Sequence, residues 1–465
     1  MTDCTAACAK NIRGNDQTFE GSKNRLSKNC CEATHIIAGF CSTSYRVDWK
    51  AGAYWNIDPY AQLGCSGGAT HQHKNHSTDS RGKCSIWWNG ELGMSRKTRP
   101  WALFVASGTI GDDYRVAVFA ETFRSVVATL GYRCSATELK PDFVLTRGLN
   151  SKWRFRFSAL WLMLQIVLFR PKIIFAVEPE ALRVIYRVRS LAGSAVIYDL
   201  HEIYEHRFAT PRAVRDRLQE VHSVALHSVD AIVSVNESVI DFYQREYIAD
   251  RCPRTLALPT YKKNRIDPDV VAERLRNYQQ GHHFRAVYVG GLTPGRGLVR
   301  AMRAASMVPR FSLDLIGEGR SSVRLSKLSK RYTAARMLPR AHYEHIPELL
   351  EHYQFGLVPY VPNCLNHKYA LPQKLFDFLA SGLPVIAADL PEVRRFVQSN
   401  KVGWIYNPSD ERSLERCLSE ITFEDYRDTL ERIVQLADEI SWERRGSAIL
   451  GRLIEDVCVQ TSNQS

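Results

Sequence analysis

The chain has little that would carry it into or across a membrane. The apolar run from Ser158 to Phe169, SALWLMLQIVLF, is far shorter than the roughly 20 apolar residues that a membrane-spanning helix requires. The N-terminal segment MTDCTAACAKNIRGNDQTFE has no apolar core of the kind that a secretion signal needs. We therefore expect a cytoplasmic protein.

The sequence also lacks the usual marks of dinucleotide, P-loop and metal sites. The glycine loop after the first expected strand has neither the dinucleotide-binding fingerprint nor the lysine of a P-loop. No Asp-x-Asp pair follows a strand where a cleft is expected, and the cysteines and histidines between Cys65 and Cys84 match no standard zinc-finger spacing. We expect no metal cofactor.

Length and composition are those of a globular protein. At roughly 100 to 200 residues per domain, 465 residues suggest two or three domains. Apolar residues make up 45% and charged residues 24%, which argues against wholesale disorder. The 12 cysteines are scattered over the long chain, so we expect most of them to be free thiols.

A net charge of +13 is the compositional outlier, and it favours nucleic acid, an anionic membrane surface or a phosphorylated substrate as partner. Basic residues bracket the apolar helical run from Ser158 to Phe169, which favours peripheral contact with an anionic membrane. A buried helix with solvated flanks explains the same pattern. The basic residues do not alternate with an exposed aromatic platform, so nucleic acid is not expected. The bracketing residues are Arg147, Lys152, Arg154, Arg156, Arg170, Lys172, Arg183, Arg187 and Arg189.

Residues 1–98 differ from the rest of the chain. They show no sustained period of 3.6 or 2, and Gly, Ser, Asn, Thr and His recur in them. We expect a poorly structured extension, and an upstream start codon would explain it equally well.

From Pro100 onward, apolar strands alternate with helical patterns. The strand Ala102 to Gly108 is followed by a loop with Gly111 and Asp112, and then by a helical pattern from Tyr114 to Gly131. Glycines let a ligand approach the backbone and a helix N-terminus favours anions, so Gly108, Gly111 and Asp112 are candidate cleft residues.

Another strand, beginning at Ala195, ends in a charged cluster. Asp199, His201 and Glu202 lie where it ends, and in open α/β sheets ligands bind at that edge. His201 and Glu202 are therefore candidate cleft residues. A hydrogen-bonded surface role for His201 is the alternative.

The second half repeats the strand-and-helix order. Its first strand, from Phe284, leads into a loop with Gly290, Gly291 and Arg296, and further strands begin near Phe311, Phe355 and Pro384. We expect two Rossmann-like domains, residues 99–265 and 282–438, facing each other across a cleft.

The segment from Tyr369 to Asp389 carries the strongest signal. A loop with Lys374 leads into a short helix that holds Asp377, Gly382 ends the helix, and Pro384 begins a buried strand. This order places an ammonium and a carboxylate at one mouth of a sheet, as a diphosphate and a ribose require.

Four segments together resemble the retaining glycosyltransferases of family 4, also called group 1, which have the GT-B fold. The resemblance covers roughly Pro100 to Asp456 and includes a final helix, 439–458, that crosses back to the first domain. The segments are SGTIGDDYRVAVFAETF, YDLHEIYEHR, YVGGLTPGRGLVRAM and ALPQKLFDFLASGLPVIAADLPE.

The resemblance implies roles for individual residues. Arg296 and Lys374 match cations that contact the donor diphosphate and stabilise the leaving group. Asp377 matches the carboxylate that accepts hydrogen bonds from the donor ribose. His201 and Glu202 line the first-domain side of the cleft, near the transferred sugar or the acceptor hydroxyl, and His201 joins the two cations as a catalytic candidate. The donor-binding set is completed by Gly290, Gly291 and Leu371.

The sequence departs from the family pattern at two positions. Many members carry two glutamates separated by seven residues, and here Tyr369 and Asp377 occupy those positions. Gly291 stands where a second basic residue is common. The first glutamate often contacts the donor sugar, so Tyr369 in its place gives no information on which sugar is transferred.

The resemblance implies an activity and its partners. We expect metal-independent transfer of a sugar from a nucleoside-diphosphate sugar to a lipid-linked or polysaccharide acceptor, with retention of configuration. Synthesis of cell-surface polysaccharide or glycolipid at the inner face of the plasma membrane is the expected setting. The alternatives are a non-catalytic sugar-nucleotide-binding scaffold and a sugar-nucleotide epimerase of the same fold.

Overall fold

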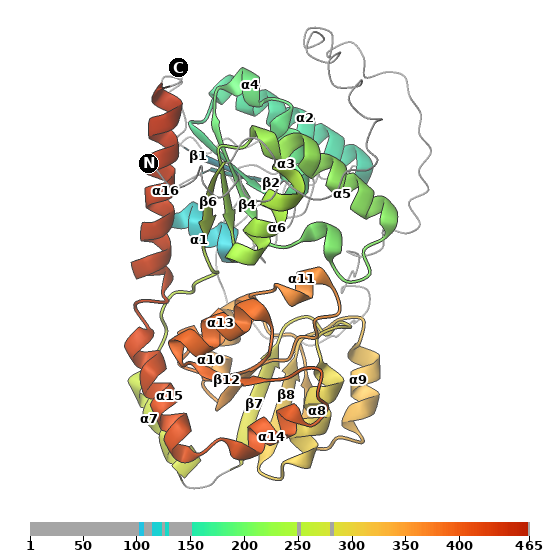
Figure 1. Cartoon of the computed structure of the whole chain (residues 1–465), viewed down its shortest axis with the longest axis vertical. Coiled ribbons are helices and arrows are strands. Elements are labelled where there is room, and N and C mark those ends of the chain that lie inside the picture. The colour runs from blue at the N-terminus through green and yellow to red at the C-terminus, as the bar shows by residue number, and fades with distance from the viewer. Residues whose placement is uncertain are drawn as a thin grey trace, which may run out of the picture. The chain divides into compact units, whose positions relative to one another are not determined.

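The computed structural model describes residues 102–106, 114–122, 126–129, 151–248, 253–279 and 283–463 (Figure 1). All of them lie in one compact unit, Asn89–Ser465. The expected extension, 1–98, and the candidate residues Gly108, Gly111 and Asp112 lie outside the described residues.

The first domain is built on a six-stranded sheet in which every pair of neighbouring strands is parallel. Its central strands β3, β4 and β5 are buried along their whole length, as expected for a parallel sheet covered on both faces. In spatial order the strands are β2 (Val126–Thr129), β1 (Ala102–Ala106), β3 (Ile173–Val177), β4 (Ala195–Leu200), β5 (Ala231–Ser234) and β6 (Arg254–Ala257).

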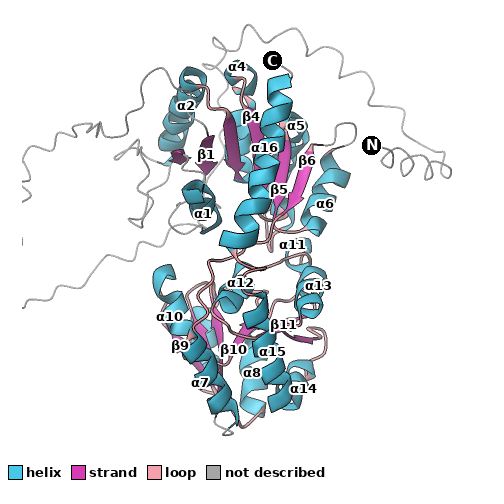
Figure 2. Ribbon diagram, turned by 90° about the vertical axis from the view of Figure 1, so that its left-hand side faces the viewer, coloured by secondary structure: helices cyan, strands magenta, loops and turns pink. Residues whose placement is uncertain are grey.

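Helices cover both faces of this sheet, because alternate strand residues point to opposite sides. On one face, Phe104 and Phe175 pack with apolar residues of α1 (Tyr114–Thr122) and α16 (Ser447–Asn463). Figure 2 shows α16 laid across the sheet. The other face carries α2 (Ser151–Phe169), α3 (Glu178–Tyr186), α4 (Arg189–Ala192), α5 (Arg212–Ala225) and α6 (Glu237–Tyr247).

The second domain repeats this plan with a second six-stranded parallel sheet. The expectation of two Rossmann-like domains with parallel sheets is confirmed. The strands, in spatial order, are β12 (Gly403–Tyr406), β11 (Val385–Ala388), β10 (Phe355–Val358), β7 (Phe284–Val289), β8 (Phe311–Ile316) and β9 (Ala335–Leu338).

Two groups of helices cover the second sheet. One face packs against α7 (Pro268–Gln279), α8 (Leu298–Met307), α9 (Ser322–Ser329) and α14 (Ser413–Glu420). The other packs against α10 (Ile346–Leu350), α12 (Gln373–Ala380) and α13 (Pro391–Asn400), and α15 (Phe423–Leu436) contributes to both. The short helix α11 (Leu365–Lys368) precedes α12.

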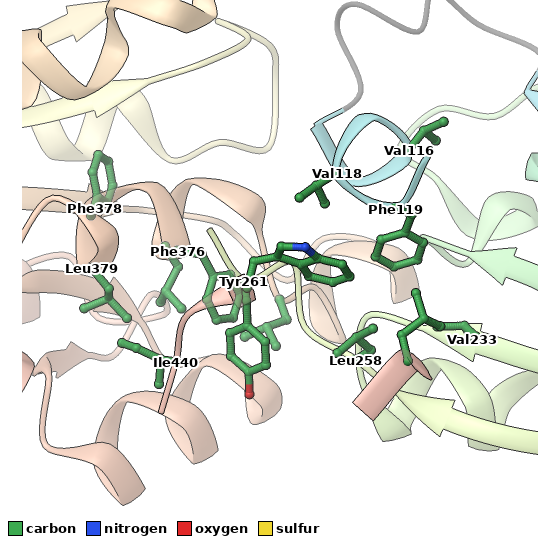
Figure 3. Packing of buried hydrophobic residues seen from close by; sticks show 14 of the residues in the cluster. Val116, Val118, Phe119, Val233, Leu258, Tyr261, Phe376, Phe378, Leu379 and Ile440 are labelled. Carbon is green, nitrogen blue, oxygen red and sulfur yellow. The ribbon is translucent and has the colours of Figure 1, made fainter. Parts of the chain in front are cut away.

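One apolar cluster runs through the junction of the two domains. Figure 3 shows Phe119 of α1 on one side and Phe376 of α12 on the other, with Tyr261 of the connecting segment between them. The rings of Tyr261 and Phe376 meet edge to face at 5.5 Å. Nearby, the indole Nε1 of Trp442 donates a hydrogen bond to Thr122 Oγ1 at 2.9 Å. The connecting segments are therefore part of the core.

The structure corrects the helical pattern expected from Tyr114 to Gly131. The helix ends at Thr122, and Val126–Thr129 forms β2, which pairs with β1. Three other short strands, β6, β9 and β12, were also not predicted. All four are edge strands of their sheets. Their pairing is a tertiary feature, and β6, β9 and β12 are only partly buried, so they lack the continuous buried run that reveals a central strand.

The apolar helix α2 extends beyond the run predicted from sequence, from Ser151 to Phe169. Within the part of the chain that the structure describes, no helix combines the length and the apolar character needed to span a bilayer.

Candidate functional site

The loop after β7, from Gly290 to Gly297, forms one wall of the candidate site. Its backbone takes positive φ angles of 131° at Gly290, 83° at Gly295 and 67° at Gly297, a region that other residues rarely adopt. A Cβ atom at Gly297 would lie 1.9 Å from the carbonyl oxygen of Pro359. Glycine therefore allows this loop to touch the loop that follows β10.

Arg296 and Lys374 converge where these two loops meet. The Arg296 guanidinium lies 4.1 Å from the ring centroid of Tyr360. Lys374 Nζ lies 4.2 Å from the ring centroid of Tyr288 and 5.1 Å from that of Tyr360. Lys374 is the second residue of α12, whereas the sequence placed it in the preceding loop. The structure thus brings together two cations that are 78 positions apart in the sequence (374 − 296).

The environment affects the two cations differently. Burial, and then the neighbouring Arg296, lower the pKa of Lys374 well below its usual range. Burial alone would lower the pKa of Arg296, but Tyr360, Tyr288 and Glu202 outweigh it and raise that pKa. Because a bound anion would favour the charged form of Lys374, this arrangement is suited to binding an anionic ligand.

The other donor-side candidates line or support the same loop. A Cβ atom at Gly290 would lie 3.1 Å from Lys374 Nζ, so glycine makes room for the ammonium. Gly291 is exposed, and its carbonyl accepts a hydrogen bond from the Tyr288 hydroxyl at 2.9 Å. Leu371 is buried in the core beside α12.

His201 follows the last residue of β4 and is held by a buried carboxylate. Its Nε2 lies 2.8 Å from Asp199 Oδ2, and Arg115 Nε donates to Asp199 Oδ1 at 2.9 Å. Burial alone would raise the pKa of Asp199, but Arg115 and His201 outweigh it and hold that pKa below its usual value. Asp199 is therefore negatively charged, and it orients the His201 imidazole.

Glu202 forms a polar contact between the two domains. Its Oε2 accepts hydrogen bonds from Arg207 Nε at 2.6 Å and from Asn366 Nδ2, on α11, at 3.2 Å. The backbone N–H of Ile203 donates to Asn366 Oδ1 at 3.0 Å. Burial alone would raise the pKa of Glu202, but Arg207, with a smaller effect from Arg296, lowers it. Sequence reasoning missed Arg207 and Asn366, because no local pattern marks either residue.

His367, also missed from the sequence, lies beside the Gly290–Gly297 loop. A Cβ atom at Gly295 would lie 2.7 Å from His367 Cε1, and His367 Nδ1 lies 2.8 Å from Asn363 Oδ1. Burial, and then the nearby Arg296, lower the pKa of His367 to about 4. The imidazole is therefore neutral near pH 7.

Asp377 lies one turn after Lys374 on α12 and has two strong partners. Its Oδ1 accepts a hydrogen bond from the Tyr343 hydroxyl at 2.8 Å and lies 3.0 Å from Lys262 Nζ. The residues around Asp377 form a small pocket. It is lined by Tyr114, Lys262, Lys263, Arg265, Tyr343, Ile346, Pro347, Leu350, Asp377, Ala380 and Ser381.

Tyr369 occupies the position where the family pattern has a glutamate, and it has a packing role. Its side chain packs against the apolar core of the first domain, and its carbonyl accepts a hydrogen bond from Asn236 Nδ2 at 2.9 Å. Tyr369 therefore contributes to the junction of the domains.

A comparison with known proteins finds a family match that lies in the second domain. Residues 283–422 match the family model described as glycosyl transferases group 1. The "Putative colanic acid biosynthesis glycosyltransferase WcaL" of Salmonella typhimurium is 24% identical over 166 residues. That match spans 34% of this chain and 41% of the relative, so it covers less than half of either protein.

Solved structures resemble both domains together. A sucrose-phosphate synthase from Thermosynechococcus elongatus has 15% identity and a TM-score of 0.59, with 77% of this chain and 100% of that chain covered. HepE from Anabaena, in complex with UDP-glucose, has 13% identity and a TM-score of 0.59, with 77% and 99% covered. A glycosyltransferase from Rickettsia africae has 12% identity and a TM-score of 0.57, with 79% and 100% covered. These likenesses confirm the expected GT-B fold.

Proposed function

We propose that this protein is a retaining glycosyltransferase of family 4. It transfers a sugar from a nucleoside-diphosphate sugar to a lipid-linked or polysaccharide acceptor. The observation that carries the proposal is the convergence of Arg296 and Lys374 on the glycine loop of a group 1 glycosyltransferase domain. The uridine diphosphate sugar bound by HepE and the biosynthetic role in the name of WcaL support this choice of donor and pathway class.

The two cations suit the departure of a nucleoside diphosphate. During transfer, the bond between the anomeric carbon and a phosphate oxygen breaks, and negative charge grows on that oxygen. Arg296 and Lys374, partly removed from water, stabilise this charge more strongly than solvated cations would. Because the protein supplies this positive charge, the proposed reaction needs no metal ion.

The first domain supplies the acceptor side of the proposed site. The acceptor hydroxyl oxygen forms a new bond to the anomeric carbon, and its proton passes to the phosphate oxygen that departs from that carbon. His201, oriented by Asp199, is the proposed group near this hydroxyl, and Glu202 lines the same edge. Asp199 fixes the imidazole orientation, which a group that contacts a reacting hydroxyl requires.

A thermal-shift screen tests the proposal first. The purified protein is heated with uridine, guanosine, adenosine or cytidine diphosphate, or with their sugars, without added metal. A ligand that binds only the folded state raises the melting temperature, so a shift with one nucleotide identifies the donor class. No shift with any nucleotide would contradict the proposal.

The alternative of a non-catalytic scaffold rests on Tyr369, which replaces a glutamate and packs into the core. A scaffold would bind a sugar nucleotide without consuming it. The released nucleoside diphosphate, measured over hours with polysaccharide and lipid-linked acceptors present, separates the two functions. Release that depends on the acceptor supports the transferase.

We also propose that α2 binds an anionic membrane surface at the inner face of the plasma membrane. Leu160, Leu164 and Leu168 follow one another at helical spacing, and they are 62%, 52% and 64% exposed. The exposed cations Arg170 and Lys172 follow the end of this stripe. Apolar side chains beside cations are suited to an interface with anionic lipids.

Vesicle flotation tests this surface. The full chain is mixed with phosphatidylglycerol vesicles or with phosphatidylcholine vesicles, and a variant with serine at 160, 164 and 168 is compared with Val323→Ser. Val323 is an exposed apolar residue of α9 in the second domain. We expect the triple variant to lose most of its binding to anionic vesicles and the control to keep it. Equal binding by both variants would contradict the proposed surface.

A further inference from the structure

Lys262 lies where the two connections between the domains meet. Its carbonyl accepts a hydrogen bond from the backbone N–H of Trp442 at 2.9 Å, so the segment after β6 is bound to the segment before α16. Its side chain is only 4% exposed. A lysine this deeply buried requires a charged or strongly polar partner, because burial of an unpaired ammonium is very unfavourable.

The ammonium of Lys262 finds these partners in both domains. Its Nζ lies 3.7 Å from the ring centroid of Tyr114, on α1, and donates a hydrogen bond to the Tyr343 hydroxyl at 2.6 Å. It also lies 3.0 Å from Asp377 Oδ1. The three polar groups of Lys262, Tyr343 and Asp377 therefore form a closed triangle, and the Tyr114 ring covers the ammonium.

Both contacts of the Asp377 carboxylate are made by the same oxygen. The Tyr343 hydroxyl and Lys262 Nζ approach Oδ1. Fixing one oxygen of a carboxylate determines its orientation and leaves Oδ2 with its acceptor capacity. No local sequence pattern indicated the contact between Lys262 and Asp377, since Lys262 lies 115 positions before Asp377 (377 − 262).

We infer that Lys262 is a positioning residue for the donor ribose: with Tyr343, it holds Asp377 Oδ1 so that Oδ2 accepts the ribose hydroxyls. The inference rests on the proposed function, which assigns Asp377 to the ribose. It adds a physical consequence, because the residue that orients this carboxylate belongs to the connection between the domains. Recognition of the ribose therefore depends on the geometry of that connection.

The test measures how strongly the protein distinguishes a ribose from a ribose without its hydroxyls. Binding of uridine, guanosine, adenosine and cytidine diphosphate to the full chain is compared with binding of the corresponding 2′,3′-dideoxy nucleotides. The variants are Lys262→Met, Tyr343→Phe and Asp377→Asn. Lys327→Met is the matched control, because Lys327 is an exposed lysine of α9.

We expect the wild type to prefer the ribonucleotide, and Asp377→Asn to lose most of that preference. Lys262→Met should reduce the preference on the order of tenfold, as expected when a hydrogen bond to a charged group is weakened. Tyr343→Phe, which keeps the ammonium, should reduce it less. Affinity for the dideoxy nucleotide should change little, and that result separates positioning from a general loss of folding.

The outcomes that would overturn the inference are distinct from those that would overturn the proposed function. If Asp377→Asn loses the preference while Lys262→Met and Tyr343→Phe keep or increase it, Lys262 does not position the carboxylate. A wild type without any preference for the ribonucleotide would remove Asp377 from the ribose. If no nucleotide binds, the proposed function and this inference are both wrong.

Discussion

The charged residues on the two sides of the candidate cleft differ in whether they form ion pairs within the protein. On the first-domain side, Asp199 is paired with Arg115 and His201, and Glu202 with Arg207. On the second-domain side, Arg296 and Lys374 lie over aromatic rings, and among the described residues neither forms an ion pair with a carboxylate. Charge on the first side is balanced within the protein, whereas charge on the second side is available to a ligand.

This difference indicates which side of the candidate cleft is suited to an anionic ligand. Burial is the larger cause of the lowered pKa of Lys374 and of His367, and Arg296 lowers both pKa values further, as positive potential on the second-domain side would. A diphosphate bound there would relieve that repulsion. The acceptor of the proposed reaction, which carries no comparable charge at its reacting hydroxyl, would then fit the balanced side.

The largest effect is expected from Arg296→Ala. Removal of a preorganised cation from the leaving group should lower kcat by a factor of about 100 to 1,000. The measurement is the initial rate of nucleoside diphosphate release at saturating donor. Arg303→Ala is the control, because Arg303 is a half-exposed residue of α8 that pairs with Glu411. Unchanged turnover in Arg296→Ala would show that the two sides do not differ in the proposed way.

His367 predicts a dependence of stability on pH. Its pKa of about 4 in the folded protein lies below the ordinary value of about 6.5. The unfolded chain therefore binds more protons between these values, and the folded state loses stability as pH falls from about 6.5 to about 4. Over this pH range, His367 lowers the free energy of unfolding by on the order of 2 kcal/mol, after allowance for partial solvent screening.

Urea unfolding of the wild type and His367→Gln at pH 7 and pH 5 measures this contribution. We expect the wild type to lose more stability than the variant on acidification. Parallel losses in the two proteins would mean that burial and Arg296 do not disfavour protonation of His367 in the folded protein.

Asp377→Asn tests the proposed role of this carboxylate in donor binding. The substitution keeps the shape but removes the charge that pairs with Lys262. We expect the donor KM to rise about tenfold, the size of a lost charged hydrogen bond, with a smaller change in kcat. Steady-state kinetics at varied donor and fixed acceptor measure both constants. A change confined to the acceptor KM would place Asp377 outside the donor site.

Glu202→Gln should give the smallest effect. The Glu202 and Arg207 side chains are 43% and 42% exposed, and exposed ion pairs contribute at most about 1 kcal/mol. Turnover should fall by no more than about fivefold. A double-mutant cycle with Asn366→Ala measures the coupling across the domains. A loss as large as that of Arg296→Ala would show that the first-domain side carries uncompensated charge as well.

The fold was predictable where burial leaves a mark on the sequence. The central strands β4 and β10 are apolar runs because helices cover both faces, and each was expected from its sequence. The edge strands β2, β6, β9 and β12 were missed. Each is held by pairing on only one side, and that pairing depends on a strand distant in the sequence.

The candidate site was predictable in part for the same reason. Arg296 and Lys374 each follow a recognisable local pattern, a glycine loop after a strand and the start of a short helix, and the structure brings them together. Glu202 was found at a strand end, but its partner Asn366 was not. Polar contacts of single residues across a domain junction leave no periodic signal.

Local order in the sequence was enough to predict two parallel-sheet domains, the resemblance to group 1 glycosyltransferases, and the place of Arg296 in the glycine loop. These follow from local order, since strand, loop and helix succeed one another within a few residues. Which of the charged residues are neutralised depends on the tertiary structure. Whether Asp377 is held by Lys262, and how far Arg296 and Lys374 are removed from water, depends on the packing of segments far apart in the chain.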